Sequence, residues 1–146
     1  MSDRADSAAT KSLAEQSALV VGVTGIQGHT LASQLNKHGW NVTGLARRKN
    51  IDLPGVTGVS VDLTARDAVQ AALHGTHPTH IFFNCWSRQA TEAENCGVNG
   101  AILRNLLEAV EDGPQLQHVA LVTGLKHYMG PFEAYALNNP DTPFRE

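Results

Sequence analysis

The sequence predicts an α/β fold in which a parallel sheet has helices on both faces. Short apolar runs rich in β-branched residues alternate with segments whose apolar residues recur every three or four positions. The run at 79–84 is nearly all apolar, which is typical of a strand covered on both sides. Strands alternating with helices imply right-handed crossovers between parallel neighbours. We therefore expect the strand order 3-2-1-4-5, with a ligand crevice where the order reverses between the first and fourth strands.

The first half of the chain supplies three of the expected strands. Val20, Val21 and Val23 favour a strand, and Leu31, Ala32 and Leu35 follow at helical spacing. The expected elements are a strand at 19–23, a helix at 26–38, a strand at 40–46, a glycine- and proline-containing loop at 53–58, and a strand at 59–61.

The second half continues the alternation. We expect a helix at 65–73, a strand at 79–84, a long helix at 92–110 ended by Gly113-Pro114, and a strand at 118–123. No further strand is expected after Phe132. The prediction is therefore a doubly wound, Rossmann-type sheet truncated at about five strands.

The composition restricts the classes of function. The chain has 146 residues, 42% of them hydrophobic, and a net charge of −3, which suit one domain with a normal core. The sequence has no basic stripe, so a nucleic-acid partner is not expected. No apolar run reaches the roughly 18 residues of a membrane span. Two cysteines imply no disulfide framework, which suits the cytoplasm.

The chain divides unevenly along its length. Residues 1–16 are rich in Ser, Ala, Asp and Lys and lack an apolar signal core, so a disordered tail is expected. Residues 17–135 are expected to form an incomplete dinucleotide-binding domain, and 136–146 a loop or tail. No substrate domain is expected in this chain.

The segment from Ala18 to Gly28 is the most informative part of the sequence. An apolar strand leads into three glycines, and a helix follows. Glycines allow a tight turn and a close backbone approach, and the helix start offers free N–H groups to a phosphate. The pattern predicts a pyrophosphate site, although glycines also mark simple turns. The expected cofactor-binding residues are Gly22, Thr24, Gly25, Ile26, Gln27 and Gly28.

Two arginines indicate which dinucleotide binds. A carboxylate at the end of the second strand would accept hydrogen bonds from both ribose hydroxyls and repel a 2′-phosphate. This chain has Arg47 and Arg48 at that place instead. Because guanidinium groups pair with phosphates, we expect NADP(H), unless these are solvated loop arginines. Asp62 and Leu63 follow the third strand, where Asp62 either accepts from the adenine amino group or caps or turns the next helix.

Other polar residues are ambiguous. Asn84, Cys85 and Trp86 end the fourth strand beside the expected nicotinamide, where a backbone contact to the cofactor and core filling fit equally well. A buried thiol is the simple interpretation of Cys85. His74, His77 and His80 invite a metal site, but Pro78 breaks any helical face and no cysteine or acid joins them. We therefore expect no metal site.

These residues resemble the extended branch of the short-chain dehydrogenase/reductase superfamily. That branch opens with variants of Thr-Gly-x-x-Gly-x-x-Gly, which Gly22–Gly28 fits. The segment Val122-Thr-Gly-Leu-Lys-His-Tyr-Met-Gly-Pro-Phe132 strongly resembles progesterone 5β-reductase and iridoid synthase-like enone reductases. Ala-Arg-Arg at 46–48 and Asn99-Gly-Ala-Ile-Leu-Arg-Asn105 also match that group. The similarity covers nearly everything from Ala18 to Phe132.

The resemblance implies that NADPH delivers hydride to the β-carbon of an α,β-unsaturated carbonyl. A lysine and a tyrosine stabilise the enolate oxygen in those enzymes, and by position the lysine is Lys126. Their tyrosine lies in a later stretch that this chain does not contain. Thr123 stands where many members carry a catalytic Ser or Thr, and Asn99 supports the site from the long helix; both are expected to contact the cofactor. Val122 precedes Lys126 by four residues, so the usual Tyr-x-x-x-Lys pair is absent.

Several interpretations of the function stay open. The chain is either the NADP(H)-binding portion of an enone reductase, inactive alone, or a non-catalytic NADP(H)-binding sensor or scaffold. A nucleotide-sugar epimerase or dehydratase shares the glycine turn but normally keeps the Tyr-x-x-x-Lys pair. The expected partner is a small enone or carbonyl substrate, and the fifth strand, as a bare sheet edge, suggests a homodimer.

Overall fold

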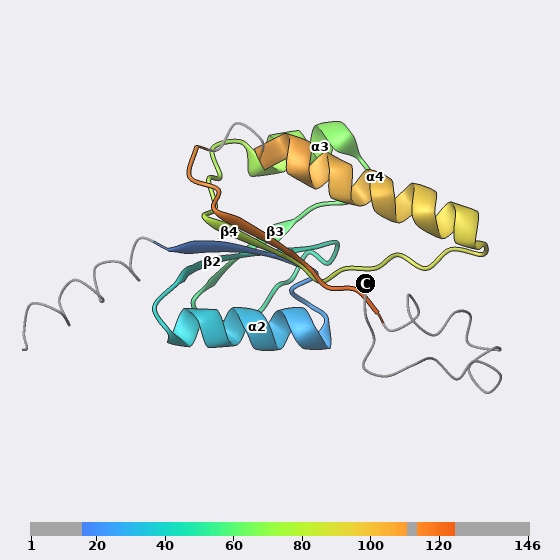
Figure 1. The fold of residues 1–146 in the computed structure, drawn as a ribbon. Coiled ribbons are helices and arrows are strands. Elements are labelled where there is room, and N and C mark those ends of the chain that lie inside the picture. Colours follow the sequence, from blue (N-terminus) through green and yellow to red (C-terminus); the bar gives the residue numbers. More distant parts are fainter. Residues whose placement is uncertain (1–15, 111–113, 125–146) are drawn as a thin grey trace, which may run out of the picture.

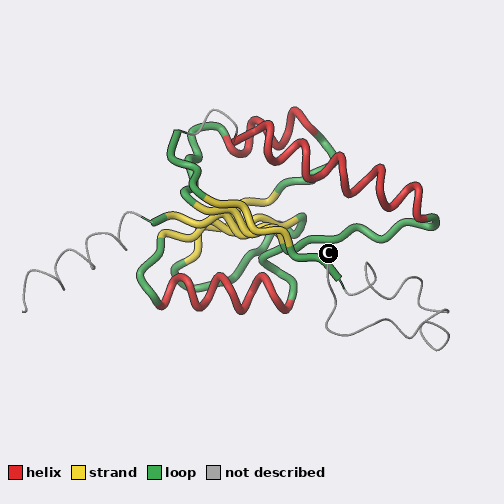
Figure 2. The backbone as a smooth tube through the Cα atoms, viewed as in Figure 1, coloured by secondary structure: helices red, strands yellow, loops and turns green. Residues whose placement is uncertain are grey.

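The computed structural model describes residues 16–110 and 114–124. It forms one five-stranded sheet of order β3-β2-β1-β4-β5, in which all four neighbouring pairs are parallel. Helix α2 covers one face, and α3 and α4 lie together on the other (Figure 1; Figure 2). The predicted fold class and strand order are thus confirmed.

Each helix and strand expected from the sequence is present, with boundaries that differ by a few residues. In chain order the elements are β1 (Ser17–Val21), α2 (Ile26–Lys37), β2 (Asn41–Ala46), β3 (Val56–Ser60), α3 (Arg66–Leu73), β4 (His80–Phe83), α4 (Glu92–Val110) and β5 (His118–Leu121).

The loop expected at 53–58 is wrong in its second half. Val56, Thr57 and Gly58 pair with β2 as the start of β3. Gly58 lies opposite Gly44, and neighbouring side chains take the space beside each glycine. A Cβ built on Gly44 would lie 2.8 Å from the Val23 methyl groups, and one on Gly58 would lie 2.9 Å from the Ile51 Cβ. These glycines accommodate packing within strands, which a local rule that assigns glycine to turns does not detect.

β1 also ends two residues earlier than expected, at Val21. Gly22 follows with φ +81°, a left-handed conformation that glycine adopts without strain. The N–H groups of Gly22 and Val23 both donate to the Leu45 carbonyl at the end of β2, at 2.9 and 3.1 Å. The turn that follows β1 is therefore fixed to the neighbouring strand.

The core consists of two apolar layers, one on each face of the sheet. Alternate residues of β1 face opposite layers: Leu19 and Val21 face α3 and α4, and Ala18 and Val20 face α2. These four side chains are at most 2% exposed. Double-sided burial explains why β1 is a continuous apolar run.

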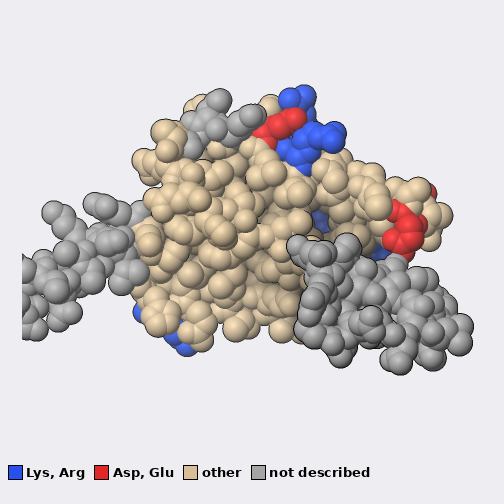
Figure 3. Space-filling view, viewed as in Figure 1, with Lys and Arg blue, Asp and Glu red and all other residues tan. Residues whose placement is uncertain are grey.

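Helix α4 begins with a reciprocal cap. The Glu94 carboxylate accepts from the Thr91 N–H at 3.0 Å, and the Thr91 hydroxyl accepts from the Glu94 N–H at 3.3 Å. None of the helices among the described residues has the length and apolar character needed to cross a membrane. In Figure 3 charged side chains are sparse on the face shown, and both signs occur side by side over α3 and α4.

Candidate cofactor-binding site

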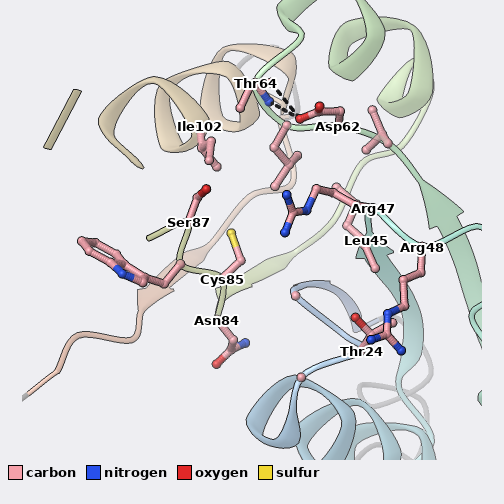
Figure 4. Close-up of a pocket in the computed structure, with 16 residues that line it drawn as sticks. Thr24, Leu45, Arg47, Arg48, Asp62, Thr64, Asn84, Cys85, Ser87 and Ile102 are labelled. Carbon is pink, nitrogen blue, oxygen red and sulfur yellow. Dashed lines mark hydrogen bonds between the residues drawn. The ribbon is translucent and has the colours of Figure 1, made fainter. Parts of the chain in front are cut away.

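A solvent-open pocket of about 340 Å³ lies at the carboxyl ends of β1, β2, β3 and β4. Its volume falls in the range of small-molecule sites, and its position is the place where doubly wound sheets bind ligands. The lining residues are Gly22, Thr24, Gly25, Leu45, Ala46, Arg47, Arg48, Val61, Asp62, Leu63, Thr64, Asn84, Cys85, Trp86, Ser87 and Ile102 (Figure 4).

Close backbone packing explains two of the three glycines in the turn. A Cβ on Gly22 would lie 2.8 Å from the Asn84 carbonyl oxygen, and one on Gly28 would lie 2.3 Å from the Gly22 carbonyl oxygen. A Cβ on Gly25 would meet only the Gly22 carbonyl oxygen, at 3.3 Å. Gly22 and Gly28 thus bring the turn against β4 and α2, whereas Gly25 lies at the pocket surface.

The start of α2 suits an anion. Gly25 is its N-cap residue, no side chain caps the helix, and its first turn contains no acidic residue. The first N–H groups of a helix lack partners within it and carry the positive end of its dipole. Ile26, which is 91% exposed, and Gln27 begin the helix just beyond the pocket lining.

Arg47 and Arg48 leave the end of β2 in different directions. In Figure 4, Arg47 reaches into the space between Cys85 and Asp62, whereas Arg48 extends toward Thr24 in the glycine turn. Both arginines are exposed pocket residues, and the Arg47 carbonyl accepts from the Ser60 hydroxyl at 3.3 Å. Two guanidinium groups therefore make this side of the pocket positively charged.

Asp62 forms a tight turn directly after β3. One carboxylate oxygen accepts from the Thr64 N–H at 3.0 Å and from the Thr64 hydroxyl at 2.8 Å. These bonds, helped by the charge of Arg47, hold the pKa of Asp62 below its ordinary value. The N-cap of α3 is Ala65, without a side-chain cap, so Asp62 is a turn residue and not a helix cap. It also lines the pocket, which keeps an adenine contact open.

The segment after β4 forms the opposite wall. The Asn84 N–H donates to the Val21 carbonyl at 3.0 Å, and the Asn84 side chain donates to the Phe82 carbonyl at 3.1 Å. Cys85 lies just beyond β4 and is partly buried against the core, so the expected buried thiol is confirmed only in part. Desolvation raises the pKa of Cys85 to about 11, although the charge of Arg47 opposes the shift. Trp86 is 65% exposed at the pocket wall.

Asn99 braces this wall from α4. The side-chain Oδ1 of Asn99 accepts from the Ser87 N–H, and its side-chain NH₂ group donates to the Ser87 backbone carbonyl, both at 2.8 Å. The same amide group donates to the Asn95 carbonyl at 2.9 Å. Asn99 itself is not among the pocket-lining residues, so the structure places it behind the wall.

The structure brings most of the predicted cofactor-binding residues into one pocket. It leaves five outside the lining: Ile26, Gln27, Gly28, Asn99 and Thr123. Thr123 is exposed after β5. Lys126, Tyr128, Phe132 and Tyr135 lie outside the described residues. Six further lining residues were not predicted from the sequence: Leu45, Ala46, Val61, Thr64, Ser87 and Ile102.

The positions of four of these six residues explain why they were missed. Leu45, Ala46 and Val61 are strand-end residues beside Arg47 and Asp62, so extending each predicted contact by one or two residues would have found them. Ile102 lies in the middle of α4 and reaches the pocket only because that helix packs over the sheet. No local signal distinguishes it from a core residue.

The predicted tail at 1–16 falls almost wholly outside the described residues, as does 136–146. The histidines of the disfavoured metal motif lie at the opposite end of the sheet, before or at the start of β4. His80 stacks edge-on against Trp40 with ring centroids 4.8 Å apart, and its Nδ1 lies 2.9 Å from the Thr79 hydroxyl. The His77 carbonyl faces the Ser17 hydroxyl at 3.4 Å. Among the described residues, no three His, Cys, Asp or Glu side chains form a group suited to a metal ion.

The parallel sheet of order β3-β2-β1-β4-β5 and the glycine turn after β1 are typical of the NAD(P)-binding Rossmann class of proteins. The model of the NAD dependent epimerase/dehydratase family matches residues 18–144, and the chain belongs to this family.

Individual relatives show which kinds of enzyme within this family the chain is similar to. The chain is 42% identical over 143 residues to an (S)-8-oxocitronellyl enol synthase of Nepeta racemosa, covering 90% of this chain and 37% of that protein. It is 39% identical to a 3-oxo-Delta(4,5)-steroid 5-beta-reductase of Arabidopsis thaliana, with the same coverage of both. The crystal structure of a putative epimerase from Burkholderia cenocepacia superposes with a TM-score of 0.65 at 25% identity, over 78% of this chain and 39% of that one. The chain thus spans little more than a third of the length of these relatives.

Proposed function

We propose that this chain is the NADP(H)-binding portion of a reductase that acts on α,β-unsaturated carbonyl compounds. The observation that carries the proposal is the pocket in which an uncapped helix start and two arginines face the carboxyl edge of the sheet. An anion with two phosphate positions, one at the helix start and one at the arginines, matches this distribution of charge.

The described residues fit such a cofactor. The first N–H groups of α2, at Ile26 and Gln27, would hold the pyrophosphate. The Gly22 and Gly25 N–H groups shape the turn instead, because they donate to the Leu45 and Gly22 carbonyls, both at 2.9 Å. Arg47 and Arg48 would bind the 2′-phosphate, and Asp62 and Leu63 the adenine. Asn84, Cys85 and Trp86 would line the path toward the nicotinamide.

The preference for NADP(H) over NAD(H) is tested by titration of the 146-residue chain with NADPH and NADH. We expect the chain to bind NADPH more tightly than NADH. Arg48→Glu should lower the affinity for NADPH at least tenfold and change the affinity for NADH by less than threefold. Each charge-assisted hydrogen bond contributes about 1.5–3 kcal/mol, and 1.4 kcal/mol is about tenfold in affinity. Lys49→Glu, a nearby exposed charge outside the pocket lining, is the matched control. Equal affinity for the two dinucleotides would overturn the assignment of the arginines.

The reaction proposed for the whole protein rests on the names of the relatives and on the motif around Lys126. The Arabidopsis relative is named for reduction of a 3-oxo-Δ4,5-steroid, which is an enone. NADPH supplies a hydride in such chemistry. The ammonium group of Lys126 would stabilise negative charge that develops on the substrate oxygen. Val122 in place of a tyrosine four residues earlier disfavours ordinary alcohol dehydrogenation and an epimerase of nucleotide sugars.

We expect the 146-residue chain to bind NADPH weakly and to turn over no enone, because the tyrosine of the resembling enzymes is not in it. Oxidation of NADPH in the presence of a cyclic enone, lost on Lys126→Ala, would contradict this expectation. A non-catalytic sensor would bind NADPH with no turnover even when the sequence is extended to the length of the relatives. The extended protein therefore separates the two functions.

A homodimer through β5 remains part of the proposal. Among the described residues β5 pairs only with β4, and Leu121 and Val122 are 51% and 47% exposed. Unpaired strand edges with exposed apolar side chains favour pairing with another chain. Light scattering at high protein concentration tests this, and a monomeric mass would contradict it. The cytoplasmic location expected from the cysteine content also stays a prediction.

A further inference from the structure

One buried polar side chain holds the pocket wall from behind and is used by none of the roles above. Asn105 lies on α4 and is 8% exposed, although an amide side chain is normally found at the surface. Its amide group donates to the Leu63 carbonyl at 2.9 Å and to the Thr64 carbonyl at 3.4 Å. Both carbonyls belong to the segment that lines the pocket between β3 and α3.

This segment presents Asp62 to the pocket. Its internal bonds run from Thr64 to the Asp62 carboxylate and from the Ala65 N–H to the Asp62 carbonyl, at 3.1 Å. Those bonds set the shape of the turn, but they do not set its position relative to the rest of the sheet. Asn105 supplies a connection from outside the turn, across more than forty residues of sequence.

Apolar packing holds α3 to α4 without help from Asn105. Val69 and Leu73 of α3 share a buried cluster with Ile102, Leu106 and Val110 of α4. The exposed ion pair between Arg66 and Glu108, at 3.1 Å, also joins the two helices. Loss of the Asn105 amide should therefore loosen the Leu63–Thr64 side of the turn without separating the helices. The start of the turn stays on β2, because the Val61 N–H donates to the Ala46 carbonyl at 3.0 Å.

We propose that Asn105 is a positioning residue for the adenosine end of the cofactor, acting through the Leu63 and Thr64 carbonyls to place Asp62. This rests on the proposed NADP(H)-binding function. Asn105 does not line the pocket, so it acts only through the turn. The opposite wall has its own braces: the side-chain Oδ1 of Asn95 accepts from the Gln89 N–H at 2.7 Å, and Asn99 holds Ser87.

Asn95 offers a matched control, because it is the same residue type on the same helix with nearly the same burial, 7% exposed. Asn105→Leu, Asn95→Leu and Glu108→Gln are compared in the 146-residue chain. Binding of adenosine 2′,5′-bisphosphate, which represents the adenosine end alone, is measured by calorimetry, and folding by circular dichroism.

We expect Asn105→Leu to lower the affinity for adenosine 2′,5′-bisphosphate by about tenfold. The other two variants should change this affinity by less than twofold. A merely structural role would reduce binding in parallel with melting temperature in both asparagine variants. If Asn105→Leu does not fold, Asn105→Ala removes the amide donor without adding bulk or charge and should show the same selective loss.

The two proposals fail in different ways. A wild-type chain that binds the bisphosphate, with unchanged affinity in the Asn105 variant or an equal loss in the Asn95 variant, would overturn the positioning role alone. A wild-type chain that binds neither NADPH nor the bisphosphate would overturn the proposed function, and the role of Asn105 with it.

Discussion

Replacement of Gly25 by valine separates ligand binding from folding at the glycine turn. Gly25 has φ −82° and ψ 163°, an extended conformation that valine adopts readily. A Cβ there would meet a single atom, the Gly22 carbonyl oxygen, at 3.3 Å. We therefore expect Gly25→Val to cost about 0.5–2 kcal/mol of folding stability, because valine is a much poorer N-cap than glycine and the 3.3 Å contact is tight, but to leave the chain folded.

The same substitution should strongly lower the affinity of the chain for NADPH. Its branched side chain would stand at the pocket surface where the proposed pyrophosphate meets the start of α2. Loss of even one hydrogen bond to a charged phosphate removes about 1.5–3 kcal/mol, which corresponds to a decrease in affinity of about 10- to 160-fold. Trp86 lines the pocket and is one of two tryptophans, so quenching of tryptophan fluorescence reports the titration.

Two other glycines provide the controls. In Gly28→Ala the added Cβ would lie 2.3 Å from a backbone oxygen, so we expect a loss of about 3 kcal/mol or more of stability from overpacking. Gly100 lies in α4 with nothing within 4 Å of its Cβ position, so Gly100→Ala should stabilise by about 0.4–1 kcal/mol and leave binding unchanged. Wild-type affinity for NADPH in a folded Gly25→Val chain would refute the reasoning, because the backbone N–H groups would not be holding the phosphates.

Two further predictions concern titration. The pKa of Cys85 is raised from 9.0 to about 11, so near pH 8 its thiolate should be about 100-fold scarcer than that of a thiol with an unshifted pKa. Iodoacetamide should therefore label the exposed Cys96 first in peptide mapping. Faster labelling of Cys85 would contradict its burial. Desolvation, with a smaller contribution from His118, lowers the pKa of His80 below its ordinary 6.5, so the unfolded chain binds the proton more readily and stability should fall as the pH drops below about 6.5. His80→Phe should reduce that fall in urea titrations between pH 7 and 5, and an unchanged slope would count against it.

The sequence predicted the fold because its signals are local and agree with one another. The apolar run of β1, the helical spacing after Gly28 and the largely apolar β4 each identify an element, and their alternation leaves one common topology. Gly58 of β3 led to an error, because the sequence placed it in a loop, whereas Gly44 of β2 was correctly placed in a strand. Glycine is a turn signal in isolation, and the packing of Val23 and Ile51 against these strands is visible only in three dimensions.

The candidate site shows the same division. Gly22, Arg47, Asp62 and Asn84 were predicted because each lies at or next to the carboxyl end of an expected strand, and parallel strands bring these ends to one edge. The directions of Arg47 and Arg48 were not predicted, since neighbouring residues in one loop carry no signal for where their side chains point.

The sequence by itself determined the order of elements, the strand edge that would carry the pocket and the charge of one wall, because these depend on periodicity, residue type and the geometry of parallel sheets. Tertiary structure alone decided that Ile102 reaches the pocket, and that Asn99 and Asn105 brace its two walls. The physical reason is that these contacts join α4 to loops far away in sequence. A buried amide finds its partners only after the helix has packed over the sheet.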